Sequence, residues 1–159
     1  MKSASEIEQF LTHEFVPTLR KLSLDTPPVW GTMNVWQMIE HIAWPFKASN
    51  GQFKMPLTTP EDKVERIKNI GLLNDKPMQR NFNNPILTDE MRKPRNASVD
   101  ASLIELQNDI NLFIQYFKTR ESNHTEIHNI FGPLNYNEWL QFHYKHVKHH
   151  LEQFGVVIE

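Results

Sequence analysis

Apolar residues recur at helical spacing in four stretches of the chain, and residues that commonly begin or end helices bound each stretch. The first stretch begins at Ser3, where Glu6 three residues later completes a capping box. Pro17 falls inside it, so we expect a helix over residues 3–22 that is kinked or broken near the proline. The apolar face of this helix consists of Ile7, Phe10, Leu11, Phe15, Leu19 and Leu22.

The other three stretches show similar start signals. Asn34 begins the second and Asn135 begins the last, and in both a Gln or Glu follows three residues later as a capping box. Each of these two ends close to a glycine, which favours helices over residues 34–49 and 135–154. The third helix is expected over residues 98–120, with one apolar face. That face consists of Leu103, Leu106, Ile110, Phe113, Ile114 and Phe117.

The middle of the chain follows a different pattern. Thr59-Pro60-Glu61-Asp62 indicates the start of a shorter helix, which Gly71 closes. The segment Leu72–Asn96 is rich in asparagine, proline and charge, and we expect it to be irregular. Between Arg66 and Arg95 there are seven Lys or Arg against three Asp or Glu. Long irregular segments are often functional, so this one is either a solvated loop or a surface that receives an anionic ligand.

Strands have little support, because no alternating run of apolar and polar residues with hairpin turns occurs. Four amphipathic helices bury their apolar faces most simply against one another. We therefore predict an all-α fold, a four-helix bundle with a long irregular insertion in the middle, in which residues 1–159 form a single domain. Any sheet should be no larger than a small hairpin.

Composition limits the kinds of site and partner that we expect for the chain. The chain has no cysteine, which excludes disulfides and thiolate metal sites and leaves His, Asp and Glu as ligands for any metal. The N-terminus lacks a signal-peptide pattern, and no apolar run is long enough to span a bilayer. The net charge of −2 disfavours nucleic-acid binding, which usually needs a basic face. We expect a cytoplasmic protein that binds neither membranes nor nucleic acids.

Histidines are concentrated in the last predicted helix, which holds four of the eight in the chain. At helical spacing, His143, His146 and His150 share an arc with aromatic residues, whereas His149 lies to one side. Side chains four positions apart can converge on one ion. The zincin motif is excluded, because Val147 stands where it requires glutamate. Spacing alone leaves two readings open, a metal site or buried histidines held by hydrogen bonds.

A third ligand would have to come from another helix, and His41 in the second helix is the natural candidate. It lies opposite the apolar face of that helix, on an arc with Gln37 and Trp44. This arc is either exposed to solvent or, as a tryptophan within it suggests, turned toward a pocket, a neighbouring helix or a second subunit. The remaining three histidines are expected at the surface or in loops, and they are His13, His124 and His128.

Two of these motifs together resemble the DinB-like superfamily, which includes YfiT-like metal-dependent enzymes. The first is Asn34-Val-Trp-Gln-Met-Ile-Glu-His41-Ile, with a tryptophan followed by a histidine in the second helix. The second is His146-Val-Lys-His-His150-Leu-Glu-Gln153, a histidine pair followed by glutamine in the fourth. The chain departs from the family pattern by its extra His143 and by the insertion Gly51–Asn96.

The resemblance implies a four-helix bundle in which His41, His146 and His150 bind nickel or zinc. It also implies, as reactions of characterised relatives, transfer of low-molecular-weight thiols such as bacillithiol or mycothiol. We therefore expect a metal-dependent transferase or hydrolase that acts on a small molecule. On this hypothesis His143 is a catalytic acid or base, because the usual pKa of histidine is near neutrality. The expected substrate-binding residues are Trp30, Gln37 and Trp44.

The alternative is a protein without catalytic activity. Apolar faces on every helix, together with Trp44 on a polar arc, would also suit a homodimeric helical binding module that keeps its histidines for packing. Analysis of the bound metal separates the two hypotheses.

Overall fold

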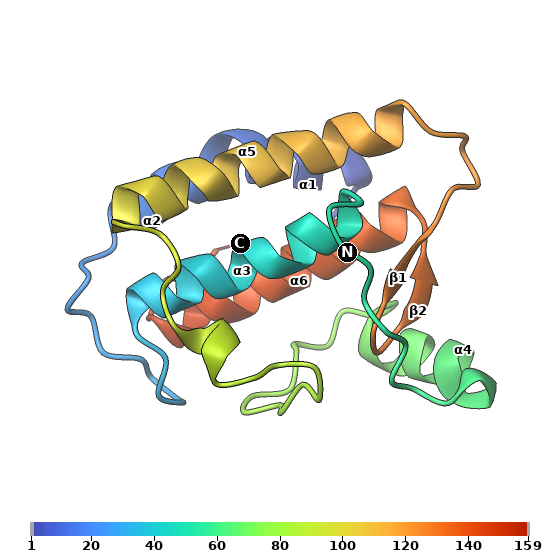
Figure 1. The fold of residues 1–159 in the computed structure, drawn as a ribbon, viewed down its shortest axis with the longest axis horizontal. Coiled ribbons are helices and arrows are strands. Elements are labelled where there is room, and N and C mark those ends of the chain that lie inside the picture. The colour runs from blue at the N-terminus through green and yellow to red at the C-terminus, as the bar shows by residue number, and fades with distance from the viewer. Residues whose placement is uncertain (1, 159) are drawn as a thin grey trace.

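Four long helical elements form a bundle in the computed structural model, which describes residues 2–158 (Figure 1). Helix α3 packs against both α5 and α6, while α1 packs against α6 and α2 against α5. This arrangement buries the apolar faces of all four elements and confirms the predicted all-α fold. The bounds are α1 Ala4–Gln9 and α2 Phe15–Arg20 in the first element, then α3 Val35–Ser49, α5 Val99–Lys118 and α6 Tyr136–Gln153.

The first element departs from α-helical geometry, as Pro17 led us to expect. A π-helical segment, η1 (Phe10–Glu14), separates α1 from α2, and the N–H of Phe15 bonds to the carbonyl of Phe10 five residues earlier. Proline lacks an N–H, and its ring crowds the carbonyl four residues before it. Pro17 lies in α2, and the π-helical turn ahead of it contains His13, the residue whose carbonyl the proline ring would otherwise crowd.

Side-chain caps explain where the helices begin. Complete capping boxes are present at the start of α1, α3 and α6, whose N-cap residues are Ser3, Asn34 and Asn135. Ser98 caps α5 by accepting a hydrogen bond from the N–H of Ala101. Each cap satisfies backbone donors that a helix start would otherwise leave unpaired. The predicted helix starts are therefore accurate to about a residue.

The middle of the chain contains one further helix and a long irregular run. Helix α4 spans Glu61–Gly71, as predicted. From there to the start of α5, the structure assigns only η2, a 3-10 turn at Glu90–Arg92, which confirms the irregular insertion. Strands β1 (Glu126–His128) and β2 (Gly132–Leu134) pair antiparallel and make a small hairpin ahead of α6.

The core lies between the four helical elements and includes the hairpin. Its largest fully buried side chain is Trp139, whose indole N–H donates to the carbonyl of Glu126 at 3.2 Å and so ties α6 to β1. Phe15, Phe46 and Phe113 bring rings from three other helices into the same core. Among residues 2–158, no helix is long and apolar enough to cross a membrane.

Candidate metal centre

Three histidines from two helices meet inside the bundle. His41 comes from α3, and His146 and His150 come from neighbouring turns of α6, which lies alongside α3 (Figure 1). The Nε2 atom of His146 lies 3.1 Å from Nε2 of His41 and 3.1 Å from Nε2 of His150. Each residue offers a nitrogen, and these nitrogens all lie within 4.8 Å of one another. We call this cluster the histidine triad.

The proton position on His150 can be deduced from its neighbour Gln153. The Nε2 amide of Gln153 donates to the carbonyl of Trp30 at 2.9 Å, so its Oε1 oxygen faces Nδ1 of His150 at 2.8 Å. An amide oxygen only accepts hydrogen bonds, so Nδ1 of His150 carries the proton. A neutral His150 ring therefore presents a bare lone pair at Nε2.

This proton assignment leaves the triad short of donors. A proton on Nε2 of His146 could satisfy either His41 or His150, but not both. A divalent cation accepts all three lone pairs. Two nitrogens bound to one tetrahedral zinc at about 2.0–2.1 Å are about 3.3 Å apart, which is close to the two separations from His146. The donor set and its spacing therefore fit a divalent metal ion.

Burial keeps the three rings neutral. It lowers the pKa of His41 to about 4, and the charges of His149 and Arg92 act in the same direction. Burial also lowers the pKa values of His146 and His150 well below the usual range, and repulsion among the histidines adds to the effect. Neutral imidazole is the form that binds metals, so the rings are ready to do so at neutral pH.

The two triad histidines on α6 are held in different ways. The bond to Gln153 orients the ring of His150, as partners beyond the ligands commonly do in metal sites. Nδ1 of His146 is buried and has no hydrogen-bond partner among residues 2–158. Its ring instead stacks on Phe142, with ring centroids 5.4 Å apart and planes 19° from parallel. On its Nδ1 side, therefore, packing rather than a hydrogen bond orients His146.

His143 lies one turn before His146 and points into the core rather than into the triad. The residue is fully buried, and its ring stacks on Phe46 with the centroids 3.7 Å apart. Its Nε2 lies 2.9 Å from Oγ of Ser49. Burial lowers its pKa well below the usual range, so the ring stays neutral near pH 7. A catalytic role for His143 stays a prediction.

The three expected substrate-binding residues lie in different settings. Trp30 is half-buried, and its ring meets that of His149 edge-on beside the triad, with the ring centroids 5.4 Å apart. The side chain of Gln37 accepts from the N–H of Asn34 at 2.9 Å and completes the cap of α3. Trp44 packs edge-on against Phe53, with the ring centroids 5.5 Å apart. Its buried indole N–H has no hydrogen-bond partner among the described residues. Binding of substrate by these residues stays a prediction.

One histidine is not where the sequence suggested. His13 is exposed and His124 is half-buried, but the expectation of a surface or loop position for His128 was wrong. His128 is buried at the end of β1, where its Nδ1 accepts from the N–H of Ile130 at 3.1 Å. Burial lowers its pKa to about 3. The hairpin folds onto Phe142 of α6, a contact that local sequence does not reveal.

Two polar residues around the triad were not singled out for a role from sequence. Gln153 belongs to the motif quoted above, and its position three residues after His150 was the available signal. Glu40, next to His41, gave no signal beyond a charge beside apolar neighbours. Its buried carboxylate accepts from the backbone N–H groups of Arg95 and Asn96 and from the Ser102 hydroxyl. Burial would raise its pKa, but these bonds outweigh burial and hold the pKa below the usual range.

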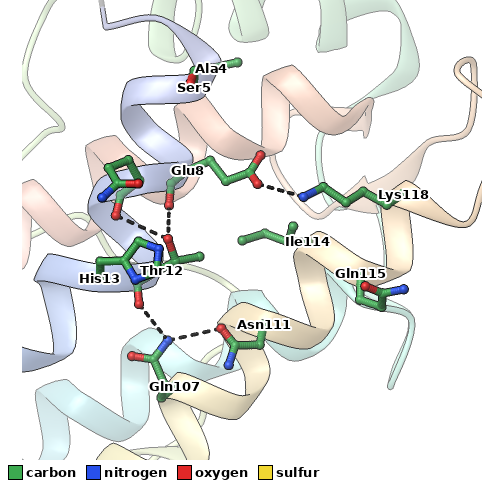
Figure 2. A pocket seen from close by; sticks show the side chains of 11 residues that line it. Ala4, Ser5, Glu8, Thr12, His13, Gln107, Asn111, Ile114, Gln115 and Lys118 are labelled. Atoms are coloured by element: carbon green, nitrogen blue, oxygen red, sulfur yellow. Dashed lines mark hydrogen bonds and ion pairs between the residues drawn. The ribbon is translucent and has the colours of Figure 1, made fainter.

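A separate polar groove of about 750 Å³ lies between the first helical element and α5, and it contains none of the triad (Figure 2). Polar side chains bridge it. The amide of Gln107 donates to the carbonyl of Thr12 at 3.3 Å, and Lys118 bonds to Glu8 at 2.9 Å (Figure 2). These groups are satisfied within the protein, so the groove itself does not indicate a ligand.

The family follows from comparison of the whole chain. The sequence profile of the DinB superfamily matches residues 8–154, which include the complete triad and Gln153. The chain therefore belongs to the DinB superfamily, a class of helical proteins that often bind divalent metals. Searches of curated proteins and of solved structures give no match.

Proposed function

We propose that this protein is an enzyme that holds nickel or zinc through His41, His146 and His150 and acts on a small molecule. The observation that supports this most directly is the convergence of three neutral imidazole nitrogens with too few protons to satisfy one another. Three protein ligands leave a coordination position open, which is the arrangement of catalytic rather than structural sites.

The reaction we propose is transfer of a low-molecular-weight thiol, such as bacillithiol or mycothiol, to an electrophilic carbon. A bound divalent ion supplies a Lewis acid that lowers the pKa of a thiol or water beside it. In the transfer, a sulfur–carbon bond forms, the leaving group departs with its bonding electrons, and the thiol proton goes to water. Gln153 keeps His150 in one tautomer, and burial keeps the ligand rings neutral. Hydrolysis would be the related reaction with water as nucleophile.

Metal analysis tests the site itself. We expect the purified, tag-free protein to bind about one nickel or zinc ion per chain. His146→Ala and His150→Ala should lose the ion while the helical circular dichroism signal persists. His13→Ala is the matched control, because His13 is exposed on η1 and belongs to no part of the triad. A wild-type protein that folds but binds neither metal would contradict the proposal and favour the non-catalytic helical module.

Turnover tests the reaction. The metal-loaded protein is incubated with an alkyl halide and either bacillithiol, mycothiol or no thiol, and products are identified by mass spectrometry. The expected product is a thioether that forms only with thiol and only with the intact triad. Product formation at the same rate in His150→Ala would contradict a role of the triad in catalysis. A hydrolysis product without thiol would assign the hydrolase reaction instead.

A further inference from the structure

The irregular segment after α4 is tied to α6, the helix that supplies two residues of the triad. The ammonium group of Lys145 bonds to the carbonyls of Gly71 and Asn74, both at 3.1 Å. Farther along, the backbone of Met78 lies close enough to the His149 ring to act on its pKa, in the raising direction. The segment is therefore held along α6 on the side where His149 neighbours His150.

The other end of the same segment is tied to α3, which supplies His41. The carboxylate of Glu40 accepts from the N–H of Arg95 at 2.6 Å and from the N–H of Asn96 at 2.9 Å. Between these two anchors, η2 packs against α3. Residues 72–96 thus run from α6 to α3, which are the two helices that build the triad (Figure 1).

A guanidinium group is held between the two anchors. The Arg80 guanidinium lies over the ring of Trp30, 4.0 Å from its centroid. Trp30 in turn is fixed near the triad, because its carbonyl accepts from Gln153 and its ring meets His149. No carboxylate pairs with Arg80 anywhere in residues 2–158, and the residue is exposed. We call Trp30 and Arg80 together the Trp30–Arg80 platform.

We infer that the Trp30–Arg80 platform is an anion-binding subsite that holds a carboxylate or phosphate group of the molecule bound at the triad. A guanidinium stacked on an aromatic face keeps the edge of its plane free, and that edge matches the two oxygens of a carboxylate or phosphate. Stacking also lowers the entropy lost on binding, because the side chain is already ordered. This inference rests on the proposed function, and it narrows the substrate class to small anionic molecules.

Calorimetric titration of the full chain tests the subsite. The probes are succinate, its uncharged diamide succinamide, and inorganic phosphate, each added to the metal-free and to the zinc-loaded protein. We expect succinate or phosphate to bind and succinamide not to bind, with binding that weakens as salt rises. The stronger of the two anions identifies the group that the subsite prefers.

Variants assign the binding to the platform. Arg80→Ala should raise the dissociation constant for the anion about tenfold or more. Arg80→Lys should recover part of the lost affinity, because lysine keeps the charge but not the paired donors. Arg120→Ala is the matched control, since the Arg120 guanidinium stacks on Tyr116 at 4.2 Å in another part of the fold. Equal effects of Arg80→Ala and Arg120→Ala, equal binding of succinate and succinamide, or no anion binding at all would overturn the inference.

The two proposals fail in different ways. If the protein binds zinc but shows no Arg80-dependent anion binding, the proposed metal site stands and the anion subsite is refuted. If the protein binds no metal but binds succinate or phosphate through Arg80, the anion subsite stands and the proposed metal enzyme is refuted. Arg80→Ala is expected to leave zinc affinity unchanged, because Arg80 contacts Trp30 and not the triad.

Discussion

Gln153 provides the sharpest test of how the triad is organised. Replacing it with leucine keeps a side chain of similar size but removes both the acceptor for Nδ1 of His150 and the donor to the Trp30 carbonyl. The bond to His150 is buried and 2.8 Å long. Without it, the ring is free to turn and to place its proton on Nε2, where a proton blocks ligation.

The expected loss of metal affinity can be taken from similar hydrogen bonds in known metal sites. Loss of a partner beyond the ligands typically weakens metal binding by about 10–100-fold, which is about 1.4–2.7 kcal/mol. We expect a loss in this range for Gln153→Leu, measured by competition for zinc against a chromophoric chelator near neutral pH. Gln141→Leu is the control, because Gln141 lies on the same helix and bonds to the carbonyl of Lys2, outside the triad.

A second substitution separates the two roles of Gln153. A glutamate there still accepts from Nδ1 of His150 but can no longer donate to the Trp30 carbonyl. Gln153→Glu should therefore keep zinc affinity close to that of the wild type while loosening the turn at Trp30. Zinc affinity of Gln153→Leu equal to wild type, or of Gln153→Glu as weak as Gln153→Leu, would refute the tautomer argument.

Three further substitutions probe the surroundings of the triad. Glu40→Gln weakens the anchor on Arg95, so we expect a loss of about 1–3 kcal/mol in unfolding free energy and faster amide exchange at Arg95; unchanged exchange would count against the anchor. Gly31→Ala should lower the unfolding free energy by about 1–2 kcal/mol and weaken zinc binding. Gly31 has φ +75°, and an added Cβ would lie 3.0 Å from Nε2 of Gln153. A fully stable variant with normal zinc affinity would argue against this. The depressed pKa of His128, about 3 in the folded protein, makes stability fall as pH drops below about 6.5, because only the unfolded chain readily takes up the proton there. His128→Asn keeps an acceptor for the turn but cannot ionise. Urea unfolding at several pH values should therefore show that its unfolding free energy falls less steeply toward acid pH than that of the wild type. An equally steep fall would assign the acid sensitivity to other groups.

The sequence by itself determined the helices and two of the three residues of the triad. Caps at Ser3, Asn34 and Asn135, and the spacing of apolar residues, depend on neighbours within one or two turns, so they can be read without a fold. The pair His146 and His150 is local in the same sense, since helical geometry alone places them side by side. His41 was proposed from its place in the second helix and from the family resemblance, because its polar arc left a solvent-exposed position open.

Only the tertiary structure decided which distant residues surround the triad. Gln153 meets Trp30, and Arg80 reaches the same tryptophan from an irregular segment with no repeating pattern. His128 was misjudged because the contact that buries it is made by a helix that begins later in the chain. Such contacts depend on how helices pack and how loops close. Side-chain periodicity reports which face of an element is buried, but it carries no information about which partner covers that face.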